Sequence, residues 1–325
     1  MSASVQAVSF KDAEAEWEAA LPRCATDTVF VTPWWQKVWW HCFGTDYELR
    51  LLAVSDGDTA LGLAPLVLRA GLLSFLGDTD LFDYHDFVVP RGNEEPFYEA
   101  VLDYLARSDA VALDLKSLPQ DSPAVELLPA VAERRGFSVA LEREDVAPVA
   151  ELPDTWDEYV AGLGKKNRHE LRRKFRRLDA AGQHTQYVCD TGRELGRCLE
   201  DFFRLHRASD PEKAAFWNPR RERFFVDVLT EAAARDTLRL AVLELDGERL
   251  ATCISIDYGS AYLLYNSGYD PTYSRLSVGL LNKALAIKGA IASGRRTFDF
   301  LRGDERYKYD LGALDRWVYR LSIRR

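Results

Sequence analysis

Charged and polar residues gather directly after a short apolar strand near the end of the chain. Apolar residues at 297–301 predict this strand, which nevertheless contains an acid, Asp299. An acid there costs free energy unless it has a partner or a task. The run that follows holds Arg302, Glu305 and Lys308, and carboxylates converging at a strand end are candidate general bases. The alternative is that Asp299 pairs with Arg302 or Lys308 and only fixes the loop.

The elements just before this run are expected to position it. An aromatic strand over 261–268 carries Tyr265 and Asn266, and a turn at Asp270-Pro271 leads to an apolar helix that ends at Gly294. Strand, helix and strand then form one βαβ unit, in which ligands bind beyond the carboxyl ends of the strands. The helix start offers unpaired N–H groups to an anion, and Ser277 is expected to cap it. The candidate anion-binding residues are therefore Ser277, Val278, Gly279 and, from the charged run, Arg302.

A second polar segment, 77–89, is both acidic and aromatic. It contains Asp80, Asp83, His85 and Asp86, but neither their spacing nor a partner cluster favours a metal site, so no metal is expected. The carboxylates either line a binding site or are solvated in a loop.

The most basic segment is predicted as one long helix over 156–181. Arg168, Arg172 and Arg176 lie four residues apart, so they form one column on the helix surface. Such a column suggests an anionic ligand, either a phosphate-bearing donor or an RNA. The alternative is that acidic loops elsewhere in the chain neutralise it.

The order of predicted elements is similar in the two halves of the chain. Each half has a hairpin at an Asp-Gly turn, Asp56-Gly57 and Asp246-Gly247, with further strands and helices around it. With 325 residues, two domains are expected, 1–155 and 156–325, each an α/β fold with a mixed sheet. A strand over 317–323 is expected to close the second one.

Composition narrows the class of protein. The formal net charge of −9 argues against a protein that coats nucleic acid. No signal peptide is evident, and no run approaches the roughly 20 apolar residues that span a bilayer, so no membrane insertion is expected. The five cysteines are odd in number and scattered, which indicates reduced thiols and a cytoplasmic protein.

Three ordered motifs carry a resemblance to a known group. The chain contains LGKKNRHELRRKFRRL, YLLYNSGYDPTYSRLSVG and FDFLRGDERYKYDLGA. Together they resemble the GNAT-like N-acyltransferases of the CelD-like (cellulose-biosynthesis) group, which is related to the Fem peptidyltransferases. The resemblance implies two tandem GNAT-like domains with a cleft between them, the second domain opening with the basic linking helix 156–181.

The same resemblance implies a reaction. An acyl group would pass, as from acetyl-CoA, to an amine of a small molecule or a cell-envelope precursor. Glu305 or Asp299 would be the base, while Lys308, Arg302 or Tyr265 would stabilise charge or protonate the leaving group. Residues 273–279 would bind the donor's pyrophosphate, and the acceptor would face Asp83, Tyr84 and Asp86. Two alternatives stay open: an aminoacyl-tRNA donor, which the basic helix would suit, and a non-catalytic metabolite-binding module.

Overall fold

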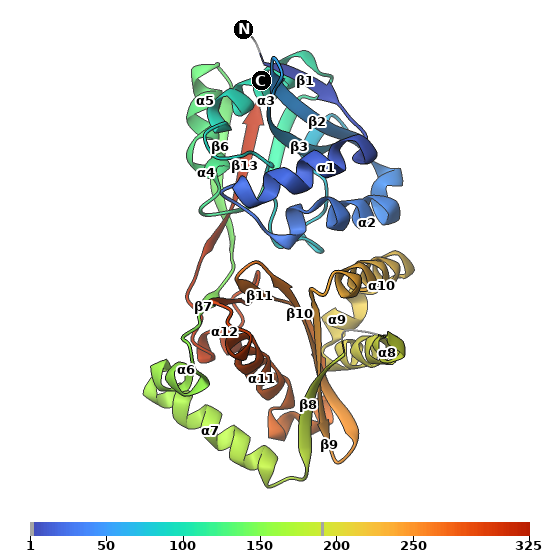
Figure 1. Cartoon of the computed structure of the whole chain (residues 1–325), viewed down its shortest axis with the longest axis vertical. Helices are drawn as coiled ribbons and strands as arrows, with labels where there is room; N and C mark the ends of the chain where they lie inside the picture. The colour runs from blue at the N-terminus through green and yellow to red at the C-terminus, as the bar shows by residue number, and fades with distance from the viewer. Residues whose placement is uncertain (1–2, 190–191) are drawn as a thin grey trace. The chain divides into compact units, whose positions relative to one another are not determined.

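The computed structural model describes residues 3–189 and 192–325, and it divides them into two compact units (Figure 1). Unit 1 comprises residues 1–146 with 316–325, and unit 2 comprises 147–315. Each is a mixed sheet covered by helices, so the expected α/β fold with mixed sheets is confirmed. Among the described residues, no helix is both long enough and apolar enough to cross a membrane.

Unit 1 is built on a seven-stranded sheet in the order β1-β2-β3-β4-β5-β13-β6. Its strands are β1 (Ser4–Ala7), β2 (Glu48–Asp56), β3 (Thr59–Arg69), β4 (Leu72–Phe75), β5 (Ala112–Pro119), β6 (Ser138–Val146) and β13 (Trp317–Arg324). Its helices are α1 (Phe10–Ala20), α2 (Pro33–Phe43), α3 (Glu94–Arg107), α4 (Pro123–Glu126) and α5 (Leu128–Arg134). Side chains alternate across the sheet, so Leu52 packs in the core cluster of α3 and Leu51 in that of α1.

Unit 2 is built on a six-stranded sheet in the order β7-β12-β11-β10-β9-β8. Its strands are β7 (Val149–Glu151), β8 (His184–Cys189), β9 (Leu238–Leu245), β10 (Glu248–Tyr258), β11 (Ala261–Tyr269) and β12 (Thr297–Asp299). Its helices are α6 (Trp156–Gly162), α7 (Lys165–Asp179), α8 (Gly192–Ser209), α9 (Pro211–Phe216), α10 (Pro219–Ala234), α11 (Val278–Ala292) and α12 (Arg306–Asp310). Helix α11 packs on one face of the sheet, and α8 and α10 cover the other (Figure 1).

Local sequence signals placed several of these elements correctly. Asp246 and Gly247 both have positive φ, as a two-residue hairpin turn between β9 and β10 requires. In both sheets the parallel pair, β4 with β5 and β11 with β12, lies among antiparallel strands. The two units therefore share the arrangement that the sequence order suggested.

Three expectations were wrong. The long helix is two helices, α6 and α7, because Leu163 is buried in an extended conformation between Gly162 and Gly164, and glycine is a weak helix former. The last strand, β13, closes the sheet of unit 1 rather than that of unit 2, with β5 and β6 as its antiparallel neighbours. Cys189 and Cys198 form a disulfide between the end of β8 and α8, so these two thiols are not reduced.

Candidate active site

The parallel strands β11 and β12 separate soon after they begin. They pair over three residues only, from Ala261 with Thr297 to Leu263 with Asp299. Beyond this point the register between β11 and β10 shifts, leaving Tyr265 as the extra residue of a bulge. Because β12 ends at Asp299, the edge of β11 from Leu264 onward has no strand beside it in the described chain. Apart from Ser267, whose N–H and carbonyl bind the side chains of Asn266 and Lys213, its backbone groups on that side are therefore available to an extended ligand.

Two of the predicted catalytic residues fix the loop after β12. One carboxylate oxygen of Asp299 accepts the backbone N–H of Leu301 at 2.8 Å, and Leu301 has a φ of 58°. The ammonium of Lys308 donates to the carbonyl oxygens of Leu301, Arg302 and Gly303 at 2.8, 2.6 and 2.9 Å. With only 1% of its side chain exposed, Lys308 positions this loop and is not accessible to a substrate.

Glu305 is an accessible acid that a buried lysine holds in place. Its carboxylate lies 2.9 Å from the Lys308 ammonium, yet 57% of its side chain is exposed. The buried lysine therefore holds an exposed carboxylate in one place at the end of β12, where the N-terminus of α12 begins. An oriented, solvent-accessible carboxylate can accept a proton from a bound amine, directly or through one water.

Two lysines that the sequence reasoning missed interact electrostatically with Glu305. Lys213 of α9 donates to the carbonyl of Ser267 on β11 at 2.8 Å, and burial lowers the pKa of its ammonium while the charge of Glu305 opposes this. Lys283 of α11 donates to the carbonyl of Gly279 at 3.2 Å, and burial lowers its pKa to about 8. The sequence signal that could have revealed Lys283 is its position within the apolar run of α11. Lys213 had no comparable signal, because α9 is short and polar.

The predicted strand residues Tyr265 and Asn266 contact the aromatic layer under α8 and α10. The Tyr265 ring stacks on Phe225 with centroids 5.3 Å apart. Asn266 lies beside His206, whose Nδ1 accepts the indole N–H of Trp217 at 3.0 Å. Burial lowers the pKa of His206 to about 3, so this imidazole is neutral at physiological pH. His206 and Trp217 are thus further residues of this region that the motifs did not reveal.

The start of α11 differs from the expected cap. Ser277 has a left-handed backbone (φ 58°, ψ 35°), and its side chain forms no capping bond. Its hydroxyl instead accepts a hydrogen bond from the ammonium of Lys174 on α7, at 2.9 Å. Val278 is fully buried, and a Cβ on Gly279 would lie 3.0 Å from the Tyr269 ring. The first N–H groups of α11 lack intrahelical partners, and a lysine stands beside them.

The cation that α7 places beside the start of α11 is Lys174, which is not part of the arginine column. Arg168 donates to the carbonyl of Ala161 at 2.7 Å and so closes the end of α6, while Arg172 is exposed. A small pocket of about 180 Å³ lies instead between α7, α11 and α12. Lys166, Lys174 and Arg306 bring positive charge to its lining, and Glu170 and Asp310 bring negative charge.

The acidic-aromatic segment belongs to unit 1. Tyr84 and Asp86 are buried there, 6% and 3% exposed, whereas Asp83 is only half-buried. Of these three predicted acceptor contacts, only Asp83 retains a partly exposed side chain. Among the described residues, no three His, Cys, Asp or Glu side chains gather as a metal site would require.

Asp86 is expected to make the stability of the protein depend on pH. Burial raises its pKa to about 6, although hydrogen bonds from Ser122 and the Phe87 N–H act against this. Between about pH 4 and 6 the unfolded chain loses this proton while the folded chain keeps it, so the free energy of unfolding falls as pH rises. In Asp86→Asn, the fall in the free energy of unfolding between pH 4 and pH 7 should be smaller by on the order of 2 to 3 kcal/mol. Urea unfolding at the two pH values measures it. Asp58→Asn, at an exposed hairpin tip, is the control. An unchanged pH profile in Asp86→Asn would contradict the prediction.

Comparisons with known proteins agree with the fold. Residues 165–309 match the family described as Acetyltransferase (GNAT) domain. The chain is similar in fold to FemX, with 13% identity and a TM-score of 0.68 over 98% of this chain and 96% of that chain. L-PGS from Bacillus licheniformis has 11% identity and a TM-score of 0.59, over 95% and 91% of the two chains. A tandem GNAT protein from the clavulanic acid biosynthesis pathway has 13% identity and a TM-score of 0.54, over 98% of each. No curated protein sequence matches the chain.

At these identities the structural likeness concerns the fold, and it confirms two tandem GNAT-type folds. The sequence match to the family described as Acetyltransferase (GNAT) domain lies within the second of them. The narrower likeness to the CelD-like group stays a prediction.

Proposed function

We propose that the protein is an N-acyltransferase that moves an acyl group from acyl-CoA to an amine, and that the reaction occurs in unit 2. The observation that carries this proposal is the separation of β11 from β12. It leaves an open strand edge between the N-terminus of α11 and the exposed carboxylate of Glu305. An extended donor lying along β11 would have its anionic end at the helix and its acyl end near the acid.

Donor binding would use backbone and side-chain groups together. The first N–H groups of α11, at Val278 and Gly279, and the ammonium of Lys174 suit the phosphates of CoA. The amides of an extended arm suit the open edge of β11. Arg302, in the loop after β12, is a further candidate contact for the donor.

The chemical step would be direct attack of a neutral amine on the thioester. The C–N bond forms while Glu305 accepts the amine proton, directly or through a water. As the C–S bond breaks, the leaving thiolate takes a proton, for which the phenol of Tyr265 is the candidate donor. Asp299 and Lys308 would act by positioning, since both bind the backbone of the loop that carries Glu305. For the acceptor, Asp83 remains a candidate contact.

Thiol release is the direct test of this proposal. The purified protein would be incubated with a panel of acyl-CoAs and a library of amines, and free thiol would be followed in time. We expect release that requires both an acyl-CoA and an amine. Tight binding of a metabolite with no turnover of any acyl donor would favour the alternative of a non-catalytic binding module.

The second candidate donor is an aminoacyl-tRNA, favoured by the exposed cations of α7 such as Arg172 and Arg176. To bind a tRNA, the protein would neutralise many of its phosphates. The logarithm of the binding constant should therefore fall with the logarithm of the salt concentration, with a slope of about 0.7 to 0.9 per phosphate. CoA carries few charges. We therefore expect binding of acetyl-CoA with a shallow salt dependence. The Lys174 ammonium beside the helix start already pairs with Glu170 at 3.4 Å. Binding of both ligands across a salt series makes the comparison.

A variant of Lys174 locates the donor site within this experiment. Lys174→Gln should weaken acetyl-CoA binding by about tenfold, because a charge-assisted contact to a phosphate is lost. Arg197→Gln, an exposed arginine on α8, serves as the matched control and should bind as the native protein does. Strongly salt-dependent tRNA binding, with no acetyl-CoA binding, would overturn the acyl-CoA proposal in favour of the tRNA-dependent one.

A further inference from the structure

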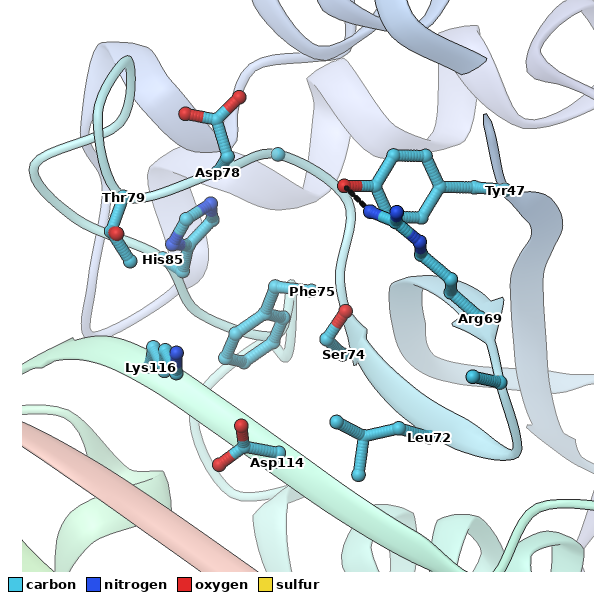
Figure 2. Close-up of a pocket in the computed structure, with 12 residues that line it drawn as sticks. Tyr47, Arg69, Leu72, Ser74, Phe75, Asp78, Thr79, His85, Asp114 and Lys116 are labelled. Carbon is cyan, nitrogen blue, oxygen red and sulfur yellow. Dashed lines mark hydrogen bonds between the residues drawn. The ribbon is translucent and has the colours of Figure 1, made fainter. Parts of the chain in front are cut away.

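Unit 1 contains a pocket at the place where its own parallel strands separate (Figure 2). Strands β4 and β5 pair over three residues, from Leu72 with Ala112 to Ser74 with Asp114. The pocket, of about 460 Å³, is lined from the paired parts of β4 and β5, from the residues that follow them, and from Tyr47 and Arg69. Its volume lies in the range of small-molecule sites. The geometry repeats that of β11 and β12, but the side chains are different.

Two cations line this pocket, and neither pairs with a carboxylate of the residues that the structure describes. Lys116 follows Asp114 by two residues on β5, so both side chains lie on one face of the strand. Asp114 is already neutralised by Arg320, whose guanidinium binds it at 2.7 and 3.0 Å. Lys116 has no ion pair with any residue that the structure describes. Arg69 is exposed and donates to the hydroxyl of Tyr47 at 3.3 Å.

The rest of the lining is largely aromatic and rigid. His85 is buried and stacks on Phe75 and on Phe82, with ring centroids 5.6 and 4.9 Å apart. Tyr47 adds a third ring, against which the Arg69 guanidinium lies 5.2 Å from the centroid. Figure 2 shows Phe75 between the side of the pocket with Arg69 and Tyr47 and the side with His85 and Lys116. A flat apolar body would therefore contact rings, and an anionic group would reach a cation.

The pocket is unsuited to the donor proposed for unit 2. In unit 2 a helix begins soon after β11 and offers its N–H groups, but β4 is followed by a long irregular segment. The next helix, α3, opens with Glu94 and Glu95, which would repel a phosphate at its N-terminus. The carboxylate of Asp78, which accepts the Trp39 indole N–H at 2.9 Å, adds negative charge at the rim. A compact anion near Lys116 and Arg69 fits better than a long polyphosphate.

We propose that this pocket binds a small organic anion, a carboxylate or phosphate carried on a flat apolar body, through Lys116 and Arg69. The pocket is lined by residues of unit 1 alone, and its occupancy does not depend on the proposed reaction.

Ligand-observed NMR on the full chain tests the site with three probes of one shape. Benzoate and phenyl phosphate carry the two anionic groups, and benzyl alcohol is the neutral counterpart. We expect saturable binding of at least one of the two anions, and binding of the neutral probe weaker by about tenfold. The stronger of the two anions identifies the head group. Equal binding of benzyl alcohol and both anions, or no binding of either anion, would overturn the proposal.

Variants place the binding in this pocket. Lys116→Gln should weaken binding of the preferred anion by about tenfold, and the double change Lys116→Gln with Arg69→Gln should abolish it. Arg91→Gln, an exposed arginine of unit 1 outside the pocket, is the matched control. Circular dichroism checks that the variants remain folded, and Lys116→Arg provides a second, charge-retaining variant that should keep binding. Undiminished anion binding in the double variant would overturn the assignment.

Discussion

Replacing Glu305 with glutamine is expected to lower the turnover of amine acylation by about 10²-fold or more, because the site then lacks the proposed general base. Glutamine keeps the size of the side chain, and its carbonyl oxygen can still accept a bond from Lys308, which lies 2.9 Å from the native carboxylate. The loop should therefore remain in place, and the KM for the donor should change little. Steady-state kinetics with saturating acyl-CoA and varied amine make the measurement.

The adjacent acid provides the control for this experiment. Asp304→Asn removes an exposed carboxylate one residue away and should leave turnover within about twofold of the native value. Among the described contacts, the Lys308 ammonium binds the carbonyls of Leu301, Arg302 and Gly303 and the carboxylate of Glu305, not that of Asp304. If Glu305→Gln retained native turnover, the base would be Asp299 or a water. Asp299→Asn distinguishes these two, because its side-chain carbonyl can still accept the Leu301 N–H.

Replacing Lys308 with methionine is expected to lower the free energy of unfolding by about 3 kcal/mol or more. The ammonium is almost fully buried and binds three carbonyl oxygens and the Glu305 carboxylate. Methionine fills a similar volume but leaves those carbonyls without a donor, which is costly in a buried site. For a unit of this size the midpoint of thermal unfolding should fall by roughly 6 to 12 °C. Urea and thermal unfolding, followed by circular dichroism, measure both quantities.

A lysine on the surface of α11 is the matched control for stability. Lys288→Met changes the same residue type at an exposed position and should alter stability by less than about 0.5 kcal/mol. Native stability in Lys308→Met would mean that the loop carbonyls find other partners. The positioning role of Lys308 would then be wrong.

The sequence by itself determined the local structure and the region of the candidate site. Period-2 and period-3.6 patterns predicted most strands and helices, and the Asp-Gly turns predicted the hairpins, because these signals depend only on near neighbours in the chain. The charged run after β12 pointed to Asp299, Glu305 and Lys308 for the same reason. Polar residues that directly follow a buried strand must lie at its end, whatever the rest of the fold does.

Only the tertiary structure decided which of these residues are accessible and what surrounds them. Lys308 and Glu305 are three residues apart, yet the side chain of Lys308 is buried and that of Glu305 is exposed. Lys213 and Lys283 come from α9 and α11, and only the packing of both faces of the sheet places them within the electrostatic influence of Glu305. The placement of β13 in unit 1 was equally undetermined, because an apolar strand pattern specifies a buried strand but not its neighbours. Periodicity reports which face of an element is buried, whereas the partner on that face depends on contacts between residues far apart in the chain.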